Sequence, residues 1–111
     1  MQGVKGGMPS ARGYIKGVAG GSKFTSTFLI DDVQYHFSGT ISPAVPDFTS
    51  NEATLEYESL RSLTSSRDFD GTVGTQSITL EVANGTKLTG QFDRPISPAS
   101  SVSGTGTWSQ N

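Results

Sequence analysis

The sequence contains no cysteine, a single histidine and a single tryptophan in 111 residues. Disulfide scaffolds, cysteine-ligated zinc sites and thiol catalysis are therefore excluded. Sites built on two histidines are excluded as well. Long apolar runs are also missing: the longest is Phe28-Leu29-Ile30, far short of the ~18 residues that a membrane-spanning helix needs. We expect no cofactor, no metal and no transmembrane span.

Positive charge is scarce, with 8 Lys and Arg against 10 Asp and Glu and a formal net charge of −2. Nucleic-acid binding requires a basic excess that neutralises phosphates, so nucleic acid is not an expected partner. The partner classes that stay open are an unknown protein, a glycan or a membrane surface. We expect the chain to meet its partner as a monomer.

The N-terminal residues carry no apolar segment of the kind found in a signal peptide. We expect residues 1–11 to be a disordered segment or tag remnant, and a signal peptide to be absent or already removed. The length fits one domain, which we place at residues 12–108.

The chain has 16 Ser, 13 Thr and 14 Gly, a composition that favours strands and turns over helices. Asp31-Asp32 and Asn84-Gly85 are typical hairpin turns between segments of alternating polarity. The patterns predict eight strands, near residues 12–18, 24–30, 33–38, 53–60, 67–74, 78–82, 88–92 and 102–108. The one helical alternative covers Asn51–Leu63, where leucines lie near a 3.6-residue period.

An internal repeat emerges at a constant offset of 55 residues. Ile41-Ser42-Pro43-Ala44 recurs as Ile96-Ser97-Pro98-Ala99, and Tyr14 and Phe37 align with Phe69 and Phe92. We interpret the chain as two pseudo-repeats, about 12–60 and 67–108, each a Greek key.

The predicted fold class is therefore all-β: a small eight-stranded antiparallel barrel or sandwich made from two Greek-key repeats. A barrel of this size fills its interior with side chains. We expect both Ile-Ser-Pro-Ala segments at one end of the barrel, with Val45 and Phe48 capping it. The expected interior residues are Tyr14, Phe24, Phe28, Ile30, Val33, Tyr35, Phe37, Leu55, Tyr57, Phe69, Val73, Ile78, Leu80, Val82, Leu88, Phe92 and Trp108.

Few residues indicate catalysis or metal binding. His36 with Asp31 or Asp32 could form part of a catalytic triad, but His36 falls on the face opposite Tyr35 and Phe37 and is expected to face solvent. Asp68-Phe69-Asp70-Gly71 resembles a fragment of a calcium loop, yet the further ligands and closing Glu of an EF-hand are missing.

A second acidic group, around the fourth strand, comprises Asp47, Glu52, Glu56 and Glu58. Paired carboxylates can cleave glycosides when they face each other across a cleft. No second aromatic-rich groove is evident for a sugar, so a solvated face is the preferred interpretation. We therefore assign no catalytic, cofactor-binding or metal-binding residue.

The final strand, Ser103-Gly104-Thr105-Gly106-Thr107-Trp108, is rich in glycine and ends in tryptophan. Together with the Asn-Gly hairpin and the doubled Greek key, it resembles the Vap family of bacterial virulence-associated proteins. The resemblance, over about Arg12 to Trp108, implies a compact eight-stranded barrel, secretion, no known enzymatic activity and action at host endolysosomal membranes. No functional residue carries over from it.

We therefore expect a non-enzymatic β-barrel protein that acts by surface recognition, as a secreted virulence-associated or host-interaction factor. The alternative is a small carbohydrate- or lipid-binding module, which a pocket containing Trp108 would favour. A third reading, a weak hydrolase, would need a cleft that holds His36 with a Ser and an Asp.

Overall fold

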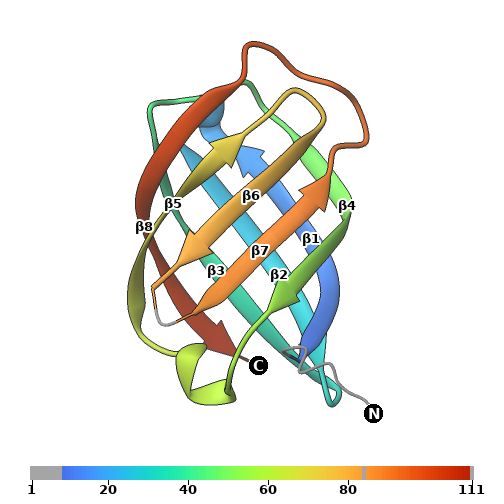
Figure 1. The fold of residues 1–111 in the computed structure, drawn as a ribbon, viewed down its shortest axis with the longest axis vertical. Coiled ribbons are helices and arrows are strands. Elements are labelled where there is room, and N and C mark those ends of the chain that lie inside the picture. Colours follow the sequence, from blue (N-terminus) through green and yellow to red (C-terminus); the bar gives the residue numbers. More distant parts are fainter. Residues whose placement is uncertain (1–8, 84, 111) are drawn as a thin grey trace.

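The computed structural model describes residues 9–83 and 85–110, which form eight antiparallel strands closed into a barrel (Figure 1). The strands are β1 (Ser10–Val18), β2 (Lys23–Ile30), β3 (Val33–Ser42), β4 (Thr49–Glu56), β5 (Ser66–Val73), β6 (Ser77–Val82), β7 (Thr86–Gln91) and β8 (Ser100–Gln110). Two short 3₁₀ turns accompany them, η1 (Ala19–Gly21) and η2 (Leu60–Ser62). The all-β prediction is confirmed, and of the two architectures left open it is the barrel that forms.

The strand order around the barrel is β1-β2-β3-β8-β5-β6-β7-β4. In the first half, β1, β2 and β3 pair consecutively and β4 returns beside β1. In the second half, β5, β6 and β7 pair consecutively and β8 returns beside β5. Since β4 also pairs with β7 and β8 with β3, the two halves close on each other and the ring of strands has no unpaired edge.

Local sequence explains the hairpins. Asp31 and Asp32 both have positive φ, 51° and 67°, which is the backbone that a two-residue type I′ turn requires. The predicted turn between β6 and β7 includes Asn84, which lies outside the described residues; its neighbour Gly85 has a φ of 79°. Where a helix was the alternative, β4 forms instead and is followed only by η2.

Several strand boundaries differ from the prediction; β3, for example, continues to Ser42, whereas the predicted strand ended at Ser38. Strand β1 begins at Ser10 and Ala11 is buried, so the domain starts before residue 12. Strand β4 ends at Glu56, whereas the predicted strand reached Leu60. Strand β8 continues to Gln110.

Aromatic rings fill the interior. The ring of Phe37 lies 4.6 Å from Trp108, 5.6 Å from Phe24 and 6.1 Å from Phe69, measured between ring centroids. Most of the expected interior residues are buried here, whereas Val33 and Phe92 are only partly buried. Glycine in β8 makes room for these rings, because a Cβ on Gly106 would lie 2.5 Å from the Phe37 ring.

The prediction that Tyr14 lies in the barrel interior is wrong. It lies on the outer face of β1, with the Nζ of Lys16 5.3 Å from its ring centre. Its neighbour Ile15 is fully buried instead. The inward positions of β1 include Gly13 and Gly17. A Cβ on Gly13 would clash with the backbone of Thr27, and a Cβ on Gly17 would clash with the ring of Phe48.

The constant offset of 55 residues is also wrong for the first two strands of each half. Tyr14 faces outward but its counterpart Phe69 is buried. Phe37 lies within β3 in the centre of the core, whereas Phe92 follows the end of β7 and is only partly buried. An odd shift in register moves every side chain of a strand to the opposite face, so Tyr14 and Phe69 are not equivalent.

Candidate functional site

Two long connections lie at the same end of the barrel (Figure 1). Residues 43–48 join β3 to β4, and residues 92–99 join β7 to β8. We call this end the crossover end. The two connections meet there, because the rings of Phe48 and Phe92 lie 5.1 Å apart, and the backbone N–H of Asp93 donates to the carbonyl of Thr49, the first residue of β4, at 2.9 Å. The Ile-Ser-Pro-Ala segments thus lie at one end, as predicted.

The first connection caps the barrel. Val45 and Phe48 are each only 4% exposed, which confirms the predicted cap. The ring of Phe48 covers Gly17 on one side and packs against Phe92 on the other, with ring centroids 5.1 Å apart. Backbone hydrogen bonds from Gly17 to Phe48 and from Val45 to Gly21, of 2.9 and 3.0 Å, attach this connection to β1 and η1. The interior is therefore shielded at this end.

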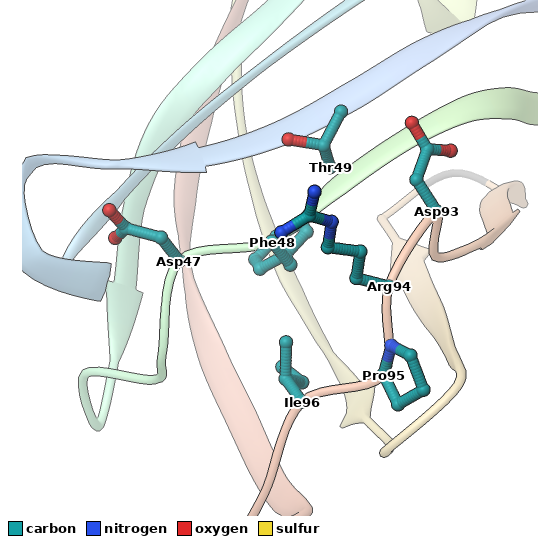
Figure 2. A pocket seen from close by; sticks show the side chains of 7 residues that line it. All are labelled: Asp47, Phe48, Thr49, Asp93, Arg94, Pro95 and Ile96. Atoms are coloured by element: carbon teal, nitrogen blue, oxygen red, sulfur yellow. The ribbon is translucent and has the colours of Figure 1, made fainter.

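Beside the cap lies a surface hollow of about 400 Å³, which we call the crossover concavity (Figure 2). This volume lies within the range of small-molecule sites in proteins, roughly 300–1,000 Å³. Figure 2 shows the Arg94 side chain extending toward Thr49 and Phe48, with Asp47 and Asp93 on either side of it. The lining residues are Asp47, Phe48, Thr49, Asp93, Arg94, Pro95 and Ile96.

The three charged residues of the concavity have different surroundings. Asp93 is held in place, since both the backbone N–H and the side-chain amide of Asn51 donate to its carboxylate. Arg94 is exposed and makes no hydrogen bond or ion pair with any residue in the described ranges. Asp47 is likewise exposed. The concavity therefore presents a guanidinium that no described residue pairs with, between two carboxylates and next to apolar atoms of Pro95 and Ile96.

The backbone around the concavity is anchored to the turn between β5 and β6. The N–H of Ile96 donates to the carbonyl of Thr75, and the N–H of Phe92 donates to the carbonyl of Gln76, both at 2.8 Å. The second connection is thus fixed on both sides of Arg94. Its side chains are presented from a supported backbone.

His36 lies on the outer face of β3, opposite Tyr35 and Phe37, as predicted. It is half-buried, and its Nδ1 shares a hydrogen bond of 2.8 Å with the hydroxyl of Thr27. That hydroxyl also lies 3.1 Å from the Tyr14 hydroxyl. In the part of the chain that the structure describes, neither Asp31 nor Asp32 pairs with His36, so the geometry does not bring a triad together.

The acidic residues singled out earlier lie on outer faces. Asp68 and Asp70 are exposed on β5 while Phe69 between them is buried, and Asp68 accepts a hydrogen bond of 2.9 Å from Thr105. Glu52, Glu56 and Glu58 are exposed as well. Within residues 9–83 and 85–110, no three His, Asp or Glu side chains converge as metal ligands.

A pocket containing Trp108 would have favoured the ligand-binding alternative, but Trp108 is 5% exposed and packs in the core against Phe37. Among the residues that line the concavity, Phe48 was predicted as part of the cap and Asp47 as part of an acidic group, but no concavity was predicted from the sequence. The available signal was the pair Asp93-Arg94 placed directly before Pro95 in a connection that joins distant strands.

Among the described residues, no helix is long and apolar enough to cross a membrane. Comparisons with family models, with curated proteins and with solved structures found no match to this chain.

Proposed function

We propose that this protein is a non-enzymatic binding protein that recognises its partner through its outer surface, at the crossover concavity. One observation carries the proposal. The barrel interior is packed with aromatic rings, while the crossover end combines a hollow of about 400 Å³ with charged side chains on an anchored backbone.

The packing favours recognition at the surface over uptake of a ligand into the barrel. Lipocalin-like binding needs an open interior, but here Phe24, Phe37 and Phe69 contact one another across it. Phe48 and Val45 cover the crossover end. A partner that approaches this end meets the concavity and not the core.

A secreted, virulence-associated or host-interaction role belongs to this proposal as its biological setting. It is supported only by the resemblance of the glycine-rich final strand and the Asn-Gly hairpin to the Vap family. A rigid, capped barrel that presents side chains at one end is compatible with such a role.

We also infer that the two halves are Greek-key repeats. The support is the strand order, since β4-β1-β2-β3 and β8-β5-β6-β7 follow the same pattern around the barrel. The two halves correspond in the order of their strands but not residue by residue, because the 55-residue offset does not hold between β1 and β5. A repeat of this kind would make the two crossover connections counterparts of each other, which fits their meeting at one end.

The binding proposal can be tested without knowing the partner. Small organic fragments concentrate at the binding hot spots of a protein surface, so a mixed fragment library serves as the probe. The measurement is the amide chemical-shift change in ¹⁵N-labelled protein. We expect the changes to cluster at Thr49, Asp93, Arg94 and Ile96. Changes that cluster on another face, or no cluster at all, would refute the assignment of the binding site.

A further inference from the structure

We infer that the crossover concavity binds a neutral saccharide, through hydroxyl groups held by Arg94, Asp47 and Asp93 and a ring face placed on Ile96. The inference rests on the proposed function and names its ligand class. Four features of the concavity carry it: the balance of charge, the supply of hydrogen-bonding groups, the apolar wall and the preorganised backbone.

The charge balance disfavours ions of either sign. An anion drawn to Arg94 meets the carboxylates of Asp47 and Asp93 in the same hollow. A cation drawn to the carboxylates meets the guanidinium. The three charges sum to −1 and alternate in space, with Arg94 in the middle (Figure 2). A neutral ligand avoids both repulsions.

The hydrogen-bonding groups match those of a polyol. A guanidinium offers five N–H donors, and a carboxylate offers about four acceptor sites. Arg94 uses none of its donors within the described chain, and Asp93 keeps acceptor capacity beyond its two bonds from Asn51. A sugar hydroxyl both donates and accepts, and two adjacent hydroxyls can pair with the paired atoms of a guanidinium or carboxylate. Saccharides supply such adjacent hydroxyls.

The apolar side of the concavity would contact the part of the saccharide that carries no hydroxyl groups. Phe48, Pro95 and Ile96 contribute apolar atoms to the lining of the concavity. A pyranose ring has one face of C–H groups that packs on such atoms, while its hydroxyls point outward. Binding sites commonly combine an apolar wall with a few placed polar groups in this way.

Preorganisation makes the site suited to a small, weakly bound ligand. Ordering a loop on binding costs free energy that a monosaccharide cannot supply. Here the N–H groups of Phe92, Asp93 and Ile96 already hold the connection to the barrel, and Asn51 already fixes the Asp93 carboxylate. The side chains that still have to become ordered on the ligand are those of Arg94 and Asp47, which are exposed.

The experiment is saturation-transfer NMR on the full chain with a panel of methyl glycosides and short oligosaccharides at millimolar concentration. Phosphate and acetate form the anion arm. Phosphatidylcholine vesicles with and without a glycolipid form the membrane arm, which distinguishes a headgroup sugar from a free one. We expect saturation of pyranose C–H protons and shift changes at Thr49 and Ile96.

The matched variants are Arg94→Met and Arg61→Met, which remove the same charge from opposite ends of the barrel. Arg94→Met should weaken saccharide binding at least about tenfold, because a hydrogen bond to a charged group is among the stronger ones. Arg61→Met, in η2, should leave it unchanged. Asp47→Asn should weaken saccharide binding by a few-fold without creating acetate binding.

Three results would overturn the inference: no saccharide of the panel binds, phosphate or acetate binds in place of the sugars, or Arg94→Met binds the saccharide as well as the wild type does. If fragments still converge on the concavity while saccharides fail, the proposed function stands and only the ligand class is wrong. If fragments converge elsewhere, the proposed binding site itself is wrong.

Discussion

The contact between Gly106 and Phe37 allows a quantitative prediction about the core. A Cβ at Gly106 would lie 2.5 Å from Cζ and 2.8 Å from Cε1 and Cε2 of the Phe37 ring. Carbon atoms in contact are normally about 3.5–4.0 Å apart. The substitution Gly106→Ala therefore forces the ring to move by roughly 1 Å. Since φ at this position is not positive, the effect is one of packing and not of backbone strain.

Phe37 has little room to move, because Trp108, Phe24 and Phe69 surround its ring at 4.6–6.1 Å between centroids. Overpacking a core by one methyl group typically costs about 1–3 kcal/mol. We expect Gly106→Ala to lower the free energy of unfolding by about 2 kcal/mol. With a urea m-value of about 2 kcal/mol per molar, the unfolding midpoint should fall by about 1 M.

The assay is urea unfolding followed by the fluorescence of Trp108, which is the single tryptophan and lies beside Phe37. Gly74→Ala is the control, because a Cβ there meets only the Ser77 carbonyl, at 3.1 Å. Phe37→Leu removes the atoms in conflict, so the double variant should be more stable than the sum of the single effects by about 1 kcal/mol. A loss below about 0.5 kcal/mol for Gly106→Ala, within the range of ordinary surface substitutions, would refute the reasoning.

Three further predictions concern buried and capping groups. The hydroxyl of Ser50 is fully buried and has no hydrogen-bond partner among residues 9–83 and 85–110, so Ser50→Ala should keep or raise stability, by up to about 1 kcal/mol. A clear loss of stability in urea unfolding would contradict this expectation. Phe48→Ala should cost about 3 kcal/mol and uncover the core to a dye that fluoresces in apolar sites; strong dye binding by the wild type, unchanged in the variant, would mean an open cavity. Thermal unfolding should not depend on EDTA, and a midpoint several degrees lower with chelator would indicate a structural metal.

The sequence was sufficient to predict the strands that carry polar residues at outward positions and large apolar residues at inward positions. In β6, Ile78, Leu80 and Val82 alternate with Thr79 and Glu81, and all three are buried. The same alternation identified β2 and β3. It also placed His36 on the outer face.

Strand β1 shows where this method fails. Its inward positions include Ala11, Gly13 and Gly17, whose small side chains give almost no hydropathy signal. Tyr14 was the largest residue nearby and was therefore assigned to the interior. Glycine is needed there because neighbouring strands approach closely, with the Thr27 carbonyl oxygen 1.7 Å from where a Cβ on Gly13 would lie. Such contacts involve strands far apart in the sequence, so local patterns cannot reveal them.

The crossover concavity was missed for a related reason. Thr49 and Asp93 are separated by more than a third of the chain, and only the closure of β4 on β7 brings them together. Charged residues in connections are usually solvated, so Arg94 carried no special signal. The cap was predictable because Val45 and Phe48 are large apolar residues in an otherwise polar connection.

The position of β8 in the ring affects how the chain can fold during synthesis. It is the last strand of the barrel to be made, yet it lies between β3 and β5, both of which emerge from the ribosome much earlier. Until β8 arrives, β3 and β5 each present an unpaired edge that another nascent chain could join. Closure also requires pairing between distant segments, which is intrinsically slow. The glycines of β8 let this late strand pack against the rings of Phe37 and Phe69. Because Trp108 then packs beside Phe37, its fluorescence should change when the barrel closes.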